Sequence, residues 1–130
     1  AESFAAAGCL GLSGTAAIHN SKVVRSSAGS VFRLPSVWDL ELKTVLAAFK
    51  SRNIPLIGTS PHAAQSITSR DWTRPAAVLI GNEGSGLNSI ESAACAEVLK
   101  IPQQPQMESL NSAIAAAVIL YEAYRRKNSS

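Results

Sequence analysis

The sequence predicts an α/β domain in which a parallel sheet is covered by helices on both faces. Short apolar runs at residues 9–12, 54–58 and 76–80 are continuous, which is typical of strands buried on both sides. Segments with helical patterning alternate with these runs, as in sheets built from strand–helix–strand units. A length of 130 residues, 46% of them hydrophobic, fits a single domain over residues 1–130 with one core.

The chain begins with alanine-rich residues that resemble the end of a helix. Residues 1–7 run directly into Gly8, a residue type that often terminates helices. We therefore expect a preceding segment to supply the start of this helix. Cys9–Leu12 is apolar and bounded by glycine on both sides, and it predicts a buried strand.

Two helices and a strand end are predicted in the following stretch. Residues 22–28 predict a short helix, and residues 31–38 predict an edge strand or strand end because Pro35 interrupts them. Asp39 is a residue type that caps helices, and we expect it to begin a helix that extends to about Arg52.

The second half of the chain is predicted to supply the rest of the sheet and a long final helix. Residues 54–58 and 76–80 form buried strands separated by a polar stretch, and residues 93–99 contribute a further strand. Ser109 is expected to cap a helix that runs to about Lys127. That helix is apolar nearly all round at first, which implies burial on more than one side, within the domain or at a subunit contact.

Composition and charge exclude several classes of protein. A formal charge of +3 permits RNA as a partner without requiring it, and only 16% charged residues exclude a disordered polyelectrolyte. The longest apolar run, residues 113–121, is about half of the ~20 residues that a membrane-spanning helix needs. Cys9, Cys95, His19 and His62 lack metal-ligand spacing, so we predict no metal site. We expect buried free thiols in a reducing compartment rather than a disulfide.

A glycine-rich turn follows the predicted strand at residues 76–80. Gly81, Gly84 and Gly86 fall within six residues, at the edge of the sheet where open α/β folds bind cofactors. Their spacing matches neither a Walker loop nor the dinucleotide-binding fingerprint. Glu83 suits a hydroxyl, amine or cationic ligand better than a phosphate. A tight connection with a solvated Glu83 remains the alternative to a ligand-binding turn.

The final helix has polar residues at its start and basic residues at its end. A capping role is sufficient to explain Ser109. Asn111 offers a carboxamide that donates and accepts beside unpaired backbone N–H groups, which favours a functional role. We interpret Arg125, Arg126 and Lys127 as a solvated basic helix end suited to the helix dipole, rather than as an RNA patch.

Together the two polar segments resemble a known family. Its motifs are matched by residues 79–87, 101–102, 108–111 and 120–123. In this order and at about this spacing they are similar to the SpoU/TrmH family of RNA ribose 2′-O-methyltransferases, in the SPOUT superfamily. The resemblance implies a C-terminal trefoil knot in the α/β fold, S-adenosyl-L-methionine as cofactor, and structured rRNA or tRNA as substrate. It also implies a homodimer with no membrane partner, in the cytoplasm or in an organelle matrix of a eukaryote.

The resemblance implies roles for individual residues. Its cofactor contacts, largely through backbone groups, fall on Thr59, Gly81, Asn82, Gly84, Gly86, Ile101, Met107 and Leu110. Its catalytic positions fall on Glu83, Ser109 and Asn111, for which we expect positioning rather than proton abstraction. Arg25 and Arg33 are assigned to RNA phosphate contact or dimer packing, with an exposed structural role as the equal alternative.

Two departures from the family pattern bear on function. The N-terminal motif Asn-x-Gly-x-x-x-Arg, to which the family's deprotonation of the ribose hydroxyl is ascribed, has no match in these residues, and we expect it upstream. Gln103 and Pro105 stand where the family often has Met and Gly, and Pro105 fixes φ. The leading prediction is methyl transfer to a ribose 2′-hydroxyl. The alternatives are a non-catalytic RNA- or cofactor-binding module and an ordinary nucleotide-binding α/β domain.

Overall fold

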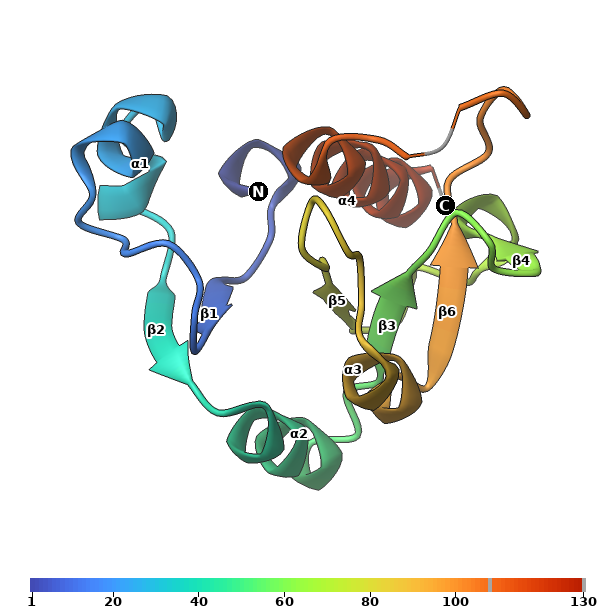
Figure 1. The fold of residues 1–130 in the computed structure, drawn as a ribbon, viewed down its shortest axis with the longest axis horizontal. Coiled ribbons are helices and arrows are strands. Elements are labelled where there is room, and N and C mark those ends of the chain that lie inside the picture. Colours follow the sequence, from blue (N-terminus) through green and yellow to red (C-terminus); the bar gives the residue numbers. More distant parts are fainter. Residues whose placement is uncertain (108, 130) are drawn as a thin grey trace. The chain divides into compact units, whose positions relative to one another are not determined.

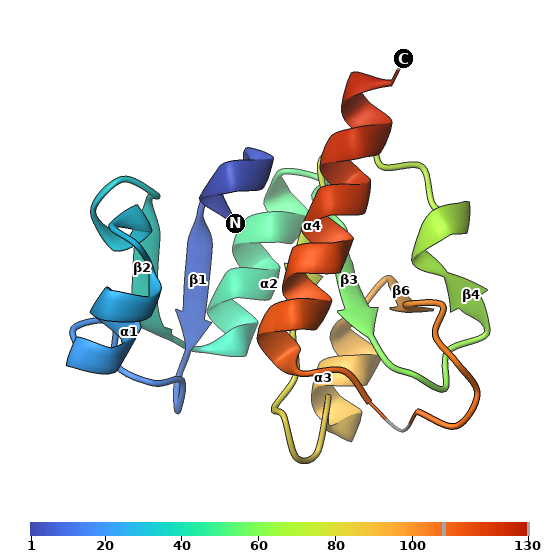
Figure 2. The same ribbon diagram turned by 90° about the horizontal axis from the view of Figure 1, so that it is seen from above.

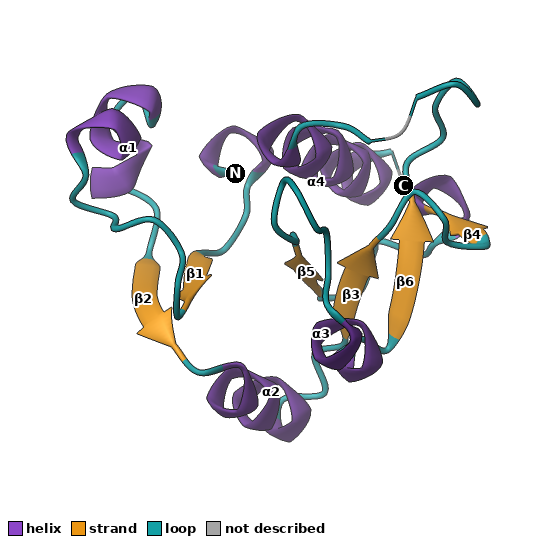
Figure 3. Cartoon of the chain, viewed as in Figure 1, coloured by secondary structure: helices purple, strands orange, loops and turns teal. Residues whose placement is uncertain are grey.

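The computed structural model describes residues 1–107 and 109–129, and Glu108, the first residue of the matched segment 108–111 (the ESLN motif), lies outside this description. The chain divides into two compact units, Ala1–Ala47 and Ala48–Ser130, and each is described by itself. Both units alternate strands with helices (Figure 3). Every strand pair in both units is parallel, which confirms the predicted α/β class.

The first unit is built on one parallel strand pair (Figure 1). Strand β1 (Cys9–Leu12) lies beside β2 (Ser36–Leu40), with Cys9 opposite Ser36. Helix α1 (Ser21–Ser26) and the 3₁₀ turn η2 (Ser30–Phe32) connect them. The predicted strand at Cys9–Leu12 is confirmed, and the predicted short helix is found one residue earlier and ends two residues sooner.

Two predictions in the first unit are wrong. The predicted helix end at residues 1–7 is a 3₁₀ turn, η1 (Glu2–Phe4), which ends at Ala5 in the left-handed region with φ 54°. Asp39 does not cap α2 (Leu42–Ser51), because it lies within β2 with φ 58° at a shift in strand register. Aspartate tolerates the left-handed region better than most residues, which suits Asp39 to its place in this bulge.

The second unit contains a four-stranded parallel sheet in the order β4-β6-β3-β5. Strands β3 (Leu56–Thr59) and β5 (Ala77–Leu79) confirm the two predicted strands, of which β3 is buried as predicted and β5 is only half-buried. Strand β6 (Glu97–Lys100) pairs with the other side of β3, and β4 (Gln65–Ser66) forms the edge. Because all four strands point the same way, the loops that follow them meet at one edge of the sheet.

Helices cover both faces of this sheet, as predicted. Ile57 of β3 packs with Leu99 and with Ile119 of α4 (Ser112–Asn128), and all three are almost fully buried. Successive residues of a strand point to opposite faces, and the neighbour Gly58 faces Cys95 at the end of α3 (Ser89–Ala94). Figure 2 shows α4 running past β3 along the second unit. The sheet is therefore a covered layer whose carboxyl edge is available for a site.

Three elements of the second unit differ from the prediction. The strand predicted at residues 93–99 begins later, because residues 93 and 94 end helix α3, whose start is fixed by a reciprocal capping box of Asn88 and Glu91, and β6 covers Glu97–Lys100. The polar stretch before β5 contains β4 and the 3₁₀ turn η3 (Ile67–Ser69). The cap of α4 is Asn111 rather than Ser109.

Burial in the second unit is uneven along α4. Ile119 and Glu122 are buried, whereas the exposed fractions of Ile114, Val118 and Tyr121 are 54%, 36% and 51%. Within this chain the helix is thus buried on one side only. In the described part of the chain, no helix is long and apolar enough to cross a membrane.

Candidate functional site

A cavity of about 480 Å³ opens at the carboxyl edge of the four-stranded sheet. Its walls come from the residues after β3, the glycine turn after β5, the segment after β6, and the first turns of α4. The two segments singled out in the sequence therefore line one cavity. This is the position where open parallel sheets bind ligands.

The glycine turn is closed by a pair of backbone hydrogen bonds. The Asn82 N–H donates to the Gly86 carbonyl at 3.0 Å, and the Gly86 N–H donates to the Asn82 carbonyl at 2.8 Å. The Asn82 side chain also accepts a hydrogen bond from the Gly84 N–H at 2.8 Å. The turn is thus preorganised, with Glu83 held at its tip beside the cavity.

The three glycines of the turn are not equivalent. A Cβ on Gly81 would collide with the Gly86 carbonyl carbon, and Gly86 has φ 66°, so the backbone requires glycine at both positions. A Cβ on Gly84 would meet only Asn82 Oδ1, at 3.5 Å, an ordinary contact. Turn geometry therefore explains why positions 81 and 86 are glycine. No steric contact within the turn requires glycine at position 84.

Asn111 joins the glycine turn to the start of α4. Its Oδ1 accepts hydrogen bonds from the N–H groups of Ala113 and Ile114 at 2.9 and 3.3 Å, which caps the helix. Its Nδ2 donates to Glu83 Oε1 at 2.9 Å. Ser112 forms a second contact between the same two segments, because its Oγ donates to the Gly81 carbonyl at 3.4 Å. The carboxamide donates and accepts together, as predicted.

Gln103 brings an unused acceptor to the cavity wall. Its Nε2 donates to the Met107 carbonyl at 3.4 Å, which closes the loop after β6. Its Oε1 is buried and has no hydrogen-bond donor among the described residues. Because buried polar atoms are normally paired, this oxygen is suited to a donor group of a ligand.

The structure brings most of the predicted site residues together. Nine line the cavity: Thr59, Gly81, Asn82, Glu83, Gly84, Gly86, Ile101, Ser109 and Leu110. Asn111 reaches it through Glu83. Met107 lies in the same loop, but its side chain is 53% exposed and it is not part of the described lining.

Arg25 and Arg33 belong to the first unit. Arg33 forms a two-pronged ion pair with Glu2, with Nε–Oε1 and Nη2–Oε2 distances of 2.6 and 2.9 Å. Arg25 Nε donates to the Ser21 carbonyl at 3.3 Å within α1. Both side chains thus have local structural contacts, and the roles that the resemblance implies for them stay predictions.

Sequence reasoning missed one wall of the cavity. Ser60 and His62 follow β3 and line it, whereas His62 has no metal-ligand spacing in the sequence and neither residue was singled out for a ligand site. His62 lies in an exposed turn, with its N–H donating to Ser60 Oγ at 3.2 Å. The signal available was the strand itself, because every loop that follows a parallel strand reaches this edge.

The described lining of the cavity carries few charged side chains, and the described residues include no cluster that could bind a metal ion. Glu83 is the one carboxylate in the described lining, to which no lysine or arginine contributes. Among residues 1–107 and 109–129, no three His, Cys, Asp or Glu side chains form a group that could hold a metal ion. The two cysteines are free and half-buried, and burial raises the pKa of both thiols. Recognition at this cavity therefore depends mainly on backbone and neutral polar groups.

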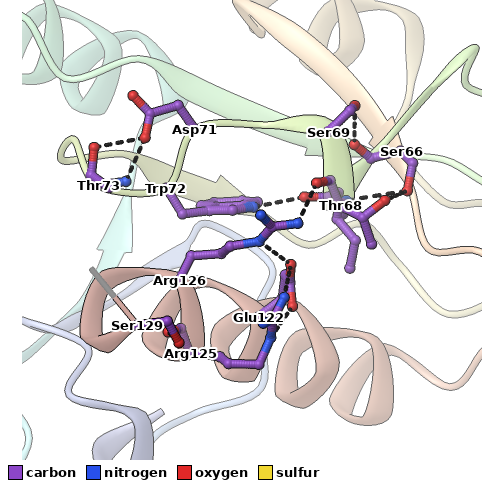
Figure 4. Close-up of polar contacts among 11 residues, drawn as sticks. Ser66, Thr68, Ser69, Asp71, Trp72, Thr73, Glu122, Arg125, Arg126 and Ser129 are labelled. Carbon is purple, nitrogen blue, oxygen red and sulfur yellow. Dashed lines mark hydrogen bonds and ion pairs between the residues drawn. The ribbon is translucent and has the colours of Figure 1, made fainter.

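The basic end of α4 is tied into the second unit (Figure 4). Glu122 accepts hydrogen bonds from Arg125 at 2.9 Å and from Arg126 at 2.8 Å, and these bonds lower the pKa of its carboxyl group. Arg126 Nη2 also donates to the Thr68 carbonyl at 2.8 Å. Through these hydrogen bonds Glu122 and Arg126 connect α4 to η3. The two arginines therefore have a structural role and do not form a solvated helix end.

Comparison with known proteins places these features in a family. The model of the SpoU rRNA Methylase family matches residues 1–121. A tRNA/rRNA methyltransferase of uncharacterised function from Synechocystis is 43% identical, over 82% of this chain and 39% of the relative. A 23S rRNA (uridine-2′-O)-methyltransferase from Streptomyces viridochromogenes is 36% identical, over 98% of this chain and 46% of the relative. The chain thus spans less than half the length of these relatives.

Solved structures share the fold. The SpoU methyltransferase AviRb from Streptomyces viridochromogenes, in complex with the cofactor AdoMet (S-adenosyl-L-methionine), superposes with a TM-score of 0.94 at 35% identity. That match covers 99% of this chain and 53% of AviRb. An AdoMet-bound rRNA methyltransferase from Sinorhizobium meliloti gives a TM-score of 0.89 at 26% identity, over 99% of this chain and 49% of that one.

Proposed function

The chain belongs to the SpoU rRNA methylase family, and we propose that it forms the AdoMet-binding part of an RNA ribose 2′-O-methyltransferase. The observation that carries the proposal is the meeting of the glycine turn and the segment after β6 around one cavity at the carboxyl edge. A relative similar over 98% of this chain is named a 23S rRNA (uridine-2′-O)-methyltransferase. Structured rRNA or tRNA is the proposed substrate, and the two free thiols are in keeping with a cytoplasmic location.

The residues at the cavity fit the proposed cofactor. A volume of about 480 Å³ is in the range of small-ligand pockets. The unpaired Gln103 Oε1 suits an amine donor, such as those of an adenine or an amino acid. Thr59, Gly81, Ile101 and Leu110 would hold the ligand mainly through backbone groups. When bound, AdoMet supplies a methyl group on a positively charged sulfur.

The polar residues at the cavity are proposed to position the reaction rather than to move protons. Asn111 fixes Glu83 beside the cavity while capping α4, so both segments keep one geometry. Ser109 lies in the lining and offers a hydroxyl to the ribose. In a displacement at carbon, alignment of the reacting atoms contributes up to roughly 7–11 kcal/mol to lowering the barrier. Rigid hydrogen-bonded loops supply such alignment.

RNA contact and subunit contact are also proposed. Arg25 is the stronger candidate for a phosphate contact, because both prongs of the Arg33 guanidinium are already paired with Glu2. The apolar stripe of Ile114, Val118 and Tyr121 on α4 is the proposed surface for a second copy of the chain. Gel filtration with light scattering tests the dimer, and a monomer at micromolar concentration would contradict it.

A trefoil knot in the C-terminal segment is the remaining structural proposal. It is supported by the family resemblance and by the position of residues 101–110 and the glycine turn around the same cavity. A knotted chain pulled from both ends stops short of the roughly 3.6 Å per residue that an open chain reaches. A single-molecule pulling curve that reaches this full length would contradict the knot.

A non-catalytic binding module is the second candidate function. The specific observation in its favour is that no arginine or lysine among the described residues lines the cavity, so its described lining offers no cationic group to polarise the ribose hydroxyl. Under this alternative the chain binds AdoMet or RNA without methyl transfer.

Two measurements separate the two candidates. Calorimetry of the full chain with AdoMet and, separately, with RNA tests binding. Incubation with AdoMet labelled on its methyl group and total RNA, followed by analysis of ribose 2′-O label, tests transfer. Binding with label supports the enzyme, binding of either ligand without label supports the module, and a folded chain that binds neither contradicts both.

A further inference from the structure

A second cavity, of about 740 Å³, lies at the opposite, amino edge of the four-stranded sheet. Asn53, Ile54 and Pro55 precede β3, and Arg74 and Pro75 precede β5. The four residues of β3 span roughly 13 Å at ~3.3 Å per residue, and this strand separates the second cavity from the first. The two cavities are therefore distinct sites.

The walls of the second cavity are rich in positive charge. Lys50, Arg70 and Arg74 contribute cations, and Asp71 is the one carboxylate in the described lining. Lys50 and Arg74 are exposed residues, and Arg74 interacts electrostatically with Asp71. The Asp71 carboxylate is engaged within its own turn, where Thr73 donates to it through N–H at 2.9 Å and Oγ1 at 2.6 Å. The available charge is thus positive.

Arg70 forms the buried back of this cavity. Its side chain is 10% exposed, Nη1 pairs with Glu97 Oε1 at 2.9 Å, and the guanidinium carbon lies 5.1 Å from the centre of the Trp72 ring. Its Nε is buried and has no acceptor among the described residues. A buried guanidinium held in place on two sides, with one donor unpaired, is a preorganised partner for an oxyanion.

We propose that this cavity binds a phosphate group. Because Arg70 is paired with Glu97, the other charged groups in the lining, Lys50, Arg74 and Asp71, leave a net positive charge, and guanidinium groups donate in pairs to phosphate oxygens. The shared chemistry is a phosphate, either a backbone phosphate of RNA or a free phosphate ester. The proposal does not depend on the first cavity being a methyltransferase site.

The test uses the full chain with two probes, inorganic phosphate and a 12-nucleotide single-stranded RNA, each titrated by NMR or calorimetry. Arg74→Ala and Lys50→Ala remove exposed cations from the cavity, whereas Lys43→Ala removes one from the same helix as Lys50 but not from the cavity lining. We expect each cavity variant to weaken phosphate binding roughly tenfold, since a hydrogen bond to a charged group contributes about that much. Lys43→Ala should leave it unchanged.

Asp71→Asn is expected to change phosphate affinity in the opposite direction. An asparagine Oδ1 still accepts from Thr73, so the turn is kept while the one lining carboxylate is lost, and phosphate binding should tighten. Circular dichroism and thermal unfolding confirm that each variant is folded, and AdoMet binding, measured in parallel, reports on the other cavity.

The two probes separate the sources of the phosphate. An RNA backbone contact is identified if the cavity variants lose RNA binding alone. The slope of the logarithm of the RNA binding constant against the logarithm of salt concentration should then be reduced by about one unit. Loss of inorganic phosphate binding identifies a site for a free phosphate ester. Equal effects of Lys43→Ala and Arg74→Ala, or no binding of either probe to the folded chain, would overturn the proposal.

Discussion

Asn111 uses its whole side-chain amide to join segments that lie 28 residues apart in the chain. The oxygen caps α4 and the nitrogen holds Glu83, so helix stability and cavity geometry depend on one residue. Asn111→Asp separates the two roles, because aspartate still caps the helix but turns a negative charge toward Glu83.

For Asn111→Asp we expect a thermal midpoint within a few degrees of the parent and AdoMet binding weakened roughly tenfold, from the loss of one charge-assisted hydrogen bond. Asn111→Ala should lose about 1 kcal/mol of stability as well as affinity, because the cap is lost. Calorimetry and thermal unfolding measure both. The double variant Glu83→Gln with Asn111→Asp restores a donor and acceptor in reversed order. Failure of that pair to regain affinity would show that the contact does not shape the cavity.

The glycine turn offers a matched pair of substitutions. Gly84→Ala adds a methyl group that the turn accommodates, so stability should change little while the methyl occupies space at the cavity and lowers AdoMet affinity. Gly81→Ala forces backbone atoms apart and should cost about 1–3 kcal/mol of folding free energy or more. Urea unfolding and calorimetry distinguish them. A Gly84→Ala variant with parent affinity would assign this glycine no role at the cavity.

At the scale of elements, three strands were predictable from their apolar runs, at residues 9–12, 54–58 and 76–80, whereas helix starts were not. Of these strands only β3 is buried along most of its length, because β5 is half-buried and Leu10 of β1 is 42% exposed. Ser109 and Asn111 are both residue types that cap helices well, and the structure uses Asn111, whose side chain also donates a hydrogen bond to Glu83. Glu83 is distant in the sequence, so this hydrogen bond could not be predicted from the residues near the helix start.

The packing of α4 against η3 depends on a buried carboxylate. Glu122 orients Arg126, which in turn donates to the Thr68 carbonyl. In Glu122→Gln the two arginines lose their charged acceptor, and we expect a loss of about 2 kcal/mol of stability. Chemical unfolding measures it, with Glu91→Gln in the α3 capping box as a control in which the acceptor at the cap is retained. Equal stability of parent and Glu122→Gln would mean that the cluster contributes no net stability.

At the scale of the whole molecule, both cavities follow from strand direction. Parallel strands collect one set of loops at each edge, and the sequence analysis used this rule only for the carboxyl edge. The basic cavity was missed because Lys50, Arg70 and Arg74 are spread over 25 positions and have no motif. Their proximity is a property of the fold, whereas the glycine turn and the ESLN motif are recognisable within a few residues.

Acid is expected to weaken both units of the chain. Hydrogen bonds from Arg33 and Ser30 lower the pKa of Glu2 to about 2, and bonds from Arg125 and Arg126 lower the pKa of Glu122. A carboxyl group whose pKa is lower in the folded state stabilises that state above its unfolded pKa, and the contribution is lost as pH falls through the folded value. For Glu2 the loss therefore lies between pH 4.5 and about 2.

Urea midpoints measured from pH 6 to pH 2 should fall steadily in the parent chain. They should fall less in a variant that carries both Glu2→Gln and Glu122→Gln. Added salt separates the two contributions, because the Glu2–Arg33 pair is exposed and 1 M salt reduces the Debye length to about 3 Å, whereas Glu122 is largely covered. In high salt the Glu2→Gln variant should therefore approach the parent, while Glu122→Gln keeps its difference. An acid profile of the double variant that coincides with the parent profile would locate the titrating groups elsewhere.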